Sequence, residues 1–218
     1  MNRLTKIIFA NPPPGGVFSD TVIENLLNGL SKEAIASAVY RAVKAGDILT
    51  LKKGLYCLDE KFIKGPRISR LVIAQKLYHP SYISFESALS YYGLIPEKVT
   101  VIISGTSRRK KEFNTPLGTF RYFSIPCSPL FVGVSTIEEN GHNVLMASPL
   151  RAIADLVYKR KEIPQGKKGI NFLIESFRIE IEGLSELDFS FSEEILHSFK
   201  DKRVKSIIEE LSENYGNL

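Results

Sequence analysis

Cysteine and histidine are scarce in this 218-residue sequence. The two cysteines, Cys57 and Cys127, lie far apart and belong to no CxxC or CxxH pair, so neither a disulfide framework nor a zinc site is predicted. The three histidines are isolated from one another, which favours surface or capping positions over a general base or a metal ligand. The sequence therefore predicts reduced thiols, no metal and no cofactor.

Long hydrophobic runs are also absent. The longest apolar stretches, such as residues 7–10 and 99–103, are much shorter than the ~20 residues that a bilayer-spanning helix needs. The first ten residues carry positive charge but only a short apolar core before the prolines at 12–14, which makes a poor signal peptide. With 44% hydrophobic and 24% charged residues, the composition is that of a folded globular protein. We expect a cytoplasmic protein without membrane contact.

Enzyme signatures are mostly missing too, and the protein is predicted not to be an enzyme. There is no GxGxxG, and GKKG at 166–169 lacks the glycine spacing and the Ser/Thr of a P-loop. Asp59-Glu60-Lys61 matches the Asp-x-Lys half of a metal-dependent nuclease site, with Asp47 as the second carboxylate. Both carboxylates would have to converge on one Mg²⁺ ion. Because Asp47 precedes a hairpin and Asp59 begins a polar linker, we expect them not to share a cavity, and a nuclease is the weakest alternative.

Positive charge is concentrated in the middle of the chain. The formal net charge is +5, but residues 1–60 are close to neutral, residues 61–130 are strongly basic and residues 131–218 are acidic. Such a distribution indicates a polyanion as a partner for the basic region.

Residues 1–60 are predicted to form helices, a turn and a hairpin in that order. Ser19 and Ser31 are good N-caps, and Gly54 permits the positive φ that a tight hairpin requires. The expected elements are helices over 3–10, 20–27 and 32–45, and strands over 17–18, 48–51 and 55–58.

This order is typical of a winged helix-turn-helix, in which the second helix of the pair enters the DNA major groove and the hairpin contacts the backbone or minor groove. The side chains predicted to meet base edges are Lys32, Ala36, Ser37 and Tyr40. The cations placed for phosphates are Arg41, Lys44, Lys52 and Lys53. The near-neutral charge of this segment leaves open a protein-interaction module without DNA contact.

Residues 61–218 are predicted to be a mixed α+β domain. Its expected helices cover 66–78, 84–92, 149–158, 170–181, 192–199 and 203–212, and its expected strands cover 99–103, 119–125, 130–134, 135–138 and 143–147. Two basic clusters stand out in this domain. The first is expected in a loop that is either solvated or in contact with phosphates, and comprises Arg108, Arg109, Lys110 and Lys111. The second, at 159–161, ends a helix, where cations are favoured by the helix dipole and need no ligand.

Three segments resemble the AbiEi-type antitoxins, bacterial transcriptional regulators of phage-defence type IV toxin–antitoxin systems. LTLKKGLY at 49–56 resembles the wing of that family, SFESALSYYGLIP at 84–96 resembles the helix that follows the winged domain, and ASPLRAIADL at 147–156 resembles its "SPxxAlxDL" helix start. The matches keep the family's order, whereas the last ~55 residues match nothing in its pattern.

The resemblance implies a repressor that binds double-stranded operator DNA through residues 1–60 and regulates its own operon, with a homodimer on DNA as one arrangement. It also implies that residues 61–218 oppose a co-encoded nucleotidyltransferase-type toxin, without requiring a stable complex. No catalytic residue is carried over from the family. Phe85, Leu89 and Leu156 are expected in the core, and Tyr56 is expected to pack beneath the wing.

Overall fold

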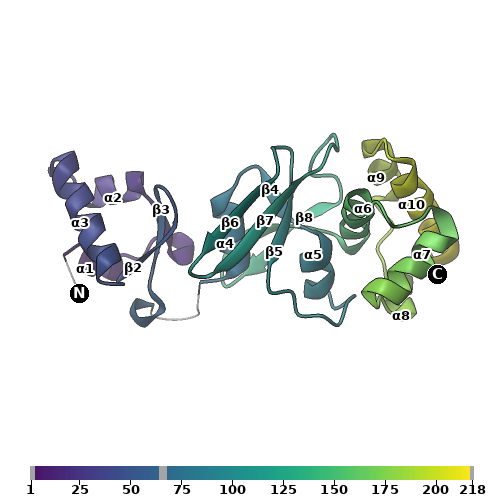
Figure 1. Cartoon of the computed structure of the whole chain (residues 1–218), viewed down its shortest axis with the longest axis horizontal. Coiled ribbons are helices and arrows are strands. Elements are labelled where there is room, and N and C mark those ends of the chain that lie inside the picture. The colour runs from purple at the N-terminus through teal and green to yellow at the C-terminus, as the bar shows by residue number, and fades with distance from the viewer. Residues whose placement is uncertain (1–2, 64–67, 217–218) are drawn as a thin grey trace.

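The computed structural model describes residues 3–63 and 68–216 and shows a mixed α+β chain, as predicted. Three parts follow one another along its longest axis (Figure 1): the elements of residues 3–63 at one end, a six-stranded sheet in the middle, and helices α6–α10 at the other end. None of the helices in the described ranges is long and apolar enough to cross a membrane.

The first part contains the helices and the hairpin predicted from its turn and cap residues. The hydroxyl of Ser19 accepts the N–H of Val22, and that of Ser31 accepts the N–H of Ala34, so both predicted N-caps are confirmed. The strands form an antiparallel sheet in the order β1-β3-β2. The elements are α1 Arg3–Ala10, η1 Pro14–Gly16, β1 Val17–Ser19, α2 Asp20–Leu26, α3 Lys32–Lys44, β2 Ile48–Lys52, β3 Leu55–Leu58 and η2 Glu60–Phe62.

The central sheet has the order β6-β7-β5-β4-β9-β8 and mixes parallel with antiparallel pairs. Its strands are β4 Ser81–Ile83, β5 Ile102–Thr106, β6 Lys111–Thr115, β7 Gly118–Ser124, β8 Val134–Glu139 and β9 His142–Ala147. The hairpin predicted from Asn140-Gly141 is confirmed. The strand expected over 99–103 begins later, at Ile102, and the strand expected over 130–134 is wrong, because residues 130–133 form a turn that leads into β8.

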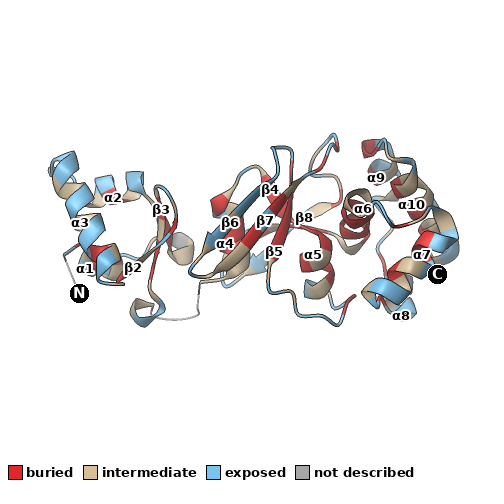
Figure 2. Cartoon of the chain, viewed as in Figure 1, coloured by how far each residue is buried: buried red, intermediate tan, exposed pale blue. Residues whose placement is uncertain are grey.

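Helices cover both faces of this sheet. Tyr122 of β7 donates its hydroxyl hydrogen to the carbonyl of Ala74, which places α4 on one face. Phe123, the next residue, packs edge-on against Phe85 at 5.6 Å, which places α5 on the other face. The helices are α4 Arg70–Leu77, α5 Phe85–Tyr91 and α6 Pro149–Lys159. Buried residues follow α5, α6 and the inner strands, whereas α3 is largely exposed (Figure 2).

Of the C-terminal helices, α9 and α10 pack against α6, and α7 and α8 pack against α10. Ser148 caps α6 by accepting the N–H of Arg151, as the Ser-Pro pair predicts. The remaining elements are α7 Gly166–Phe177, α8 Ile181–Ser185, α9 Ser192–Ser198 and α10 Lys202–Tyr215. The predicted helix over 66–78 begins partly outside the described residues, and α4 begins at Arg70.

The β2–β3 hairpin packs against the rest of the chain. Val17, Leu51, Leu55 and Cys57 are buried in the same apolar cluster as the central sheet and its helices. A second, smaller cluster, built around α1, α2 and α3, fills the interior of the first part. The boundary region around residue 60 thus connects two parts that share buried surface.

Cys57 lies in this shared surface, and we expect it to resist alkylation in the folded protein. Burial, with a smaller effect from the charge of Asp59, raises the pKa of the thiol to about 12. Because the thiolate is the nucleophile, its population near pH 8 falls about a thousandfold below that of an ordinary thiol. Iodoacetamide labelling followed by mass spectrometry should find the Cys57 peptide unmodified in native protein and modified in denaturant. Equal labelling rates in both conditions would contradict this packing.

Candidate nucleic-acid interface

Helix α3 exposes one continuous polar side. Ile35, Val39 and Ala42 lie at helical spacing and contribute to the second, smaller apolar cluster, so the opposite side faces solvent. Tyr40 is the most prominent side chain there, with 65% of its surface exposed. The side chains exposed on this surface include the predicted DNA contacts Lys32, Ala36, Ser37, Tyr40, Arg41 and Lys44. The structure therefore brings these predicted residues together on one accessible helix face.

The charge on this face is positive overall, with one acid in the first helical turn. Glu33 is fully exposed, and hydrogen bonds from its own backbone amide and from the Ser31 hydroxyl lower the pKa of its carboxyl. The ammonium of Lys44 lies 5.9 Å from the ring centre of Tyr40, one turn before it. Lys32 and Glu33 are neighbours at the start of the helix, and Arg41 and Lys44 lie in its last turn.

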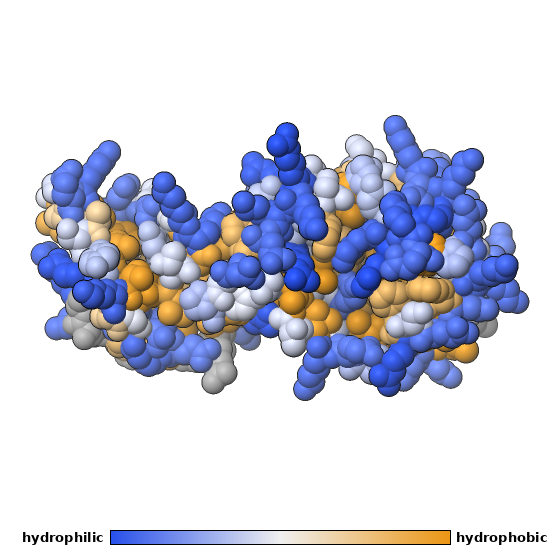
Figure 3. Space-filling view, in the orientation of Figure 1, coloured by the Kyte–Doolittle hydropathy of each residue, from blue (hydrophilic) through white to orange (hydrophobic). Residues whose placement is uncertain are grey.

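Beside α3 runs a groove that sequence reasoning did not predict. It has a volume of about 510 Å³ and lies between α2, α3 and the hairpin, with Ile35, Val39 and Val43 on its apolar side. Figure 3 shows this hydrophobic surface next to the polar side chains of α3. Tyr56 also lines the groove, as do the acids Asp20 and Glu24. Burial, then a hydrogen bond with Asp20, raises the pKa of the Tyr56 hydroxyl. The groove combines residues from three separate elements, so no single sequence pattern signals it.

The two hairpin lysines have different surroundings. Lys52 is half-buried, and its ammonium donates to the carbonyl of Leu77 at 2.7 Å. Burial, then the charge of Arg108, lowers the pKa of Lys52. Lys53 is exposed. Both were predicted to contact phosphates, but in this conformation Lys52 joins the hairpin to the sheet domain, and Lys53 is the one open to solvent.

The basic cluster at 108–111 lies close to the hairpin. All four side chains are exposed, as predicted, but Lys111 begins strand β6 instead of lying in a loop. β6 runs beside β2, and Arg108 is near enough to Lys52 to affect its pKa. The guanidinium of Arg108 lies 5.6 Å from the ring of Tyr78, and Lys111 lies 5.8 Å from the ring of Phe113. The fold thus adds the cations Arg108, Arg109, Lys110 and Lys111 to the hairpin end of the surface.

The carboxylates of the nuclease-like pattern do come together, contrary to the sequence-based expectation. The ammonium of Lys61 lies 3.9 Å from Asp47 and 3.7 Å from Asp59. It also donates to the carbonyl of Gly46 at 2.7 Å, and Asp47 accepts a hydrogen bond from Thr5. The single ammonium therefore compensates one of the two negative charges. Within the described ranges, no group of three or more His, Cys, Asp or Glu side chains could hold a metal ion.

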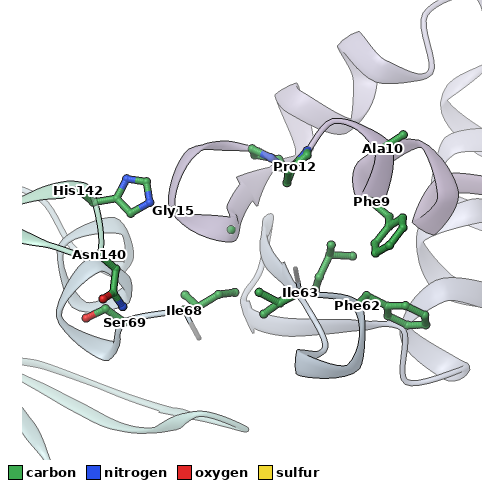
Figure 4. Close-up of a pocket in the computed structure, with 13 residues that line it drawn as sticks. Phe9, Ala10, Pro12, Gly15, Phe62, Ile63, Ile68, Ser69, Asn140 and His142 are labelled. Atoms are coloured by element: carbon green, nitrogen blue, oxygen red, sulfur yellow. The ribbon is translucent and has the colours of Figure 1, made fainter. Parts of the chain in front are cut away.

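A cavity with a volume of about 720 Å³ lies between the first part and the sheet domain (Figure 4). Its walls are mainly apolar, with Phe9, Phe62 and Ile68 among them, and His142 and Asn140 lie at one end. Among the described residues that line it there is no Lys, Arg, Asp or Glu.

No protein-family model and no curated protein sequence matches this chain. Its function is therefore inferred from the residues and their arrangement.

Proposed function

We propose that the protein is a DNA-binding transcriptional repressor in which residues 1–60 act as a winged helix-turn-helix. The observation that carries this proposal is the open polar face of α3, which exposes Lys32, Ser37 and Tyr40 near residues capable of contacting phosphates. In this arrangement α3 lies in the major groove of double-stranded operator DNA. Lys32, Ser37 and Tyr40 read base edges, while Arg41 and Lys44 hold the backbone.

The sheet domain extends the contact along the DNA. Lys53 at the hairpin tip and the exposed cations 108–111 provide charge without base specificity. Lys52 positions the hairpin through its bond to Leu77, and its removal is expected to loosen the hairpin as well as to remove a charge. The two parts of the chain therefore act on DNA together.

The genetic context of this repressor is proposed from its sequence resemblance. The segments 49–56, 84–96 and 147–156 support a cytoplasmic antitoxin that regulates its own operon and counteracts a nucleotidyltransferase-type toxin in phage defence. Co-expression with the product of the neighbouring reading frame tests this role. Growth arrest by that product, relieved by this protein, is the expected result. No relief would remove the antitoxin role and leave the repressor role intact.

The DNA-binding proposal is tested by gel shift with the protein's own upstream region across a series of salt concentrations. We expect Lys53→Ala to weaken binding to the operator and to an unrelated duplex alike, because a phosphate contact carries no sequence information. The slope of log affinity against log salt should fall by about 1. Lys168→Ala is the matched control, because Lys168 is equally exposed but lies on α7 at the far end of the chain.

The same experiment separates the alternatives. No shift with the upstream region, at low salt, would favour a protein-interaction module. Cleavage of the DNA with Mg²⁺, lost in Asp59→Ala, would favour the nuclease. We expect a shift, because the polar face of α3 is exposed. We expect no cleavage, because the ammonium of Lys61 is close to both carboxylates.

A further inference from the structure

A pocket on the opposite side of the sheet from α4 combines cations with an apolar wall. It has a volume of about 470 Å³ and lies where the ends of α6 and α7 meet α5 and the β5 and β7 strands. Val99, Val101 and Phe177 contribute apolar surface. The charged residues of the lining are the cations Lys98, Arg121, Lys159 and Arg160 and the acids Glu86 and Glu97, of which Glu97 is paired with Arg178. This volume is in the range of sites for small organic ligands.

Lys159 is the central cation of this pocket. Its ammonium lies 3.9 Å from the ring centre of Phe123 and 5.3 Å from that of Phe85, and the side chain is half-buried. No carboxylate in residues 3–63 and 68–216 lies within salt-bridge distance of it. Burial, then the neighbouring charges Arg160, Arg121 and Lys110, lowers its pKa, and Glu86 only partly opposes this effect. A helix dipole alone does not account for a lysine drawn into such surroundings.

The acids around Lys159 are already paired with other cations. Glu86 accepts a bond from Arg160 at 3.1 Å, and Glu112 accepts one from Arg121 at 2.6 Å. The Glu86–Arg160 pair is joined by a single hydrogen bond, from Nη2 of Arg160 to Oε1 of Glu86. The second oxygen of Glu86 and the Nε of Arg160 are buried without a hydrogen-bond partner. The pocket wall therefore holds an uncompensated cation, an unused donor and an unused acceptor.

We propose that this pocket binds a small phosphomonoester that carries hydroxyl groups and a flat apolar body, the chemistry of a nucleoside monophosphate. The phosphate compensates Lys159 and accepts hydrogen bonds from the guanidinium nitrogens of Arg121 that Glu112 does not use. A ligand hydroxyl donates to the free oxygen of Glu86, and the flat body lies on the wall formed by Val99, Val101 and Phe177. This site adjoins the proposed DNA interface, because Lys110 of that surface lies 5.4 Å from the ring centre of Phe123, which Lys159 also contacts.

Calorimetric titration of the full-length protein with AMP tests the site, with adenosine and inorganic phosphate as partial ligands. We expect saturable binding of AMP and weaker binding of each partial ligand. Lys159→Met keeps the aliphatic contact with Phe123 and removes the charge, so AMP affinity should fall about tenfold or more. Arg121→Gln changes an exposed side chain and should also weaken AMP binding without affecting folding. Lys168→Met serves as the matched control, because it removes an exposed lysine outside the pocket.

The proposal is overturned if AMP gives no saturable signal at millimolar concentrations. It is also overturned if Lys159→Met and Lys168→Met bind AMP as tightly as the unmodified protein. If inorganic phosphate binds with the same affinity as AMP, the site recognises only the anion, and the proposal that it also recognises an organic group is wrong. If AMP fails to bind and Lys159→Met weakens the binding of duplex DNA, Lys159 belongs to the nucleic-acid surface instead.

Discussion

Replacing Asp155 with alanine is expected to lower the free energy of unfolding by about 3–5 kcal/mol, because it leaves a buried guanidinium without its counter-charge. Asp155 and Arg151 are both completely buried, one helical turn apart on α6, and Nε of Arg151 donates to Asp155 at 3.0 Å. The same carboxylate accepts bonds from the hydroxyls of Tyr82 at 2.8 Å and Ser84 at 2.6 Å. One substitution therefore removes the acceptor of three donors.

The surroundings of Arg151 make this loss difficult to relieve. Its guanidinium lies between the rings of Tyr82, at 5.1 Å, and Phe199, at 5.2 Å, and it also donates to the carbonyl of Val132. Burial is the largest single effect and would lower the pKa of Arg151, but the charge and hydrogen bond of Asp155, together with Tyr82 and Cys127, outweigh it, and the pKa is raised. The side chain cannot reach water by changing its rotamer alone, so the charge stays buried when Asp155 is lost.

Urea denaturation of the variants checks this prediction. Asp155→Asn should cost less than Asp155→Ala, since it keeps an acceptor for part of the network. The double variant Arg151→Met, Asp155→Ala should recover part of the loss, because no unpaired charge remains. Glu112→Gln is the surface control: its pair with Arg121 is shorter, at 2.6 Å, but exposed, and we expect no measurable change. A loss in Asp155→Ala as small as in this control would show that the network does not stabilise the fold.

The second large effect is expected on DNA binding from α3. The double variant Lys32→Ala, Tyr40→Ala should weaken binding to the operator by about thirtyfold or more, because each of the two lost base-edge contacts contributes about 1–3 kcal/mol of discrimination. Binding to an unrelated duplex should change much less. Arg41→Ala, by contrast, should weaken binding to both duplexes to a similar degree, since a phosphate contact carries no sequence information.

Gel shift with both duplexes at one salt concentration measures this difference. All three side chains are exposed, so the variants are expected to unfold at the same temperature as the unmodified protein. Full operator affinity in the Lys32→Ala, Tyr40→Ala variant would place base reading elsewhere. If that variant bound both duplexes more weakly by the same factor, α3 would contribute charge but no specificity.

Local chemistry in the sequence determined much of the first part and several individual elements elsewhere. Ser19, Ser31 and Ser148 start helices through bonds to amides three residues away, and Asn140-Gly141 turns the β8–β9 hairpin. The polar side of α3 also follows from its own periodicity. These features could be predicted because the interacting groups are neighbours in the chain.

Only the tertiary structure decided which charges are free. Lys52 and Lys53 are adjacent in sequence, but burial against Leu77 separates their surroundings. From the sequence, Lys159 is predicted to be a solvated cation at a helix end, whereas in the fold it lies against Phe85 and Phe123. Lys61 contacts two aspartates from different segments of the chain. Desolvation and pairing depend on groups that are distant along the chain, so periodicity and spacing carry no information about them.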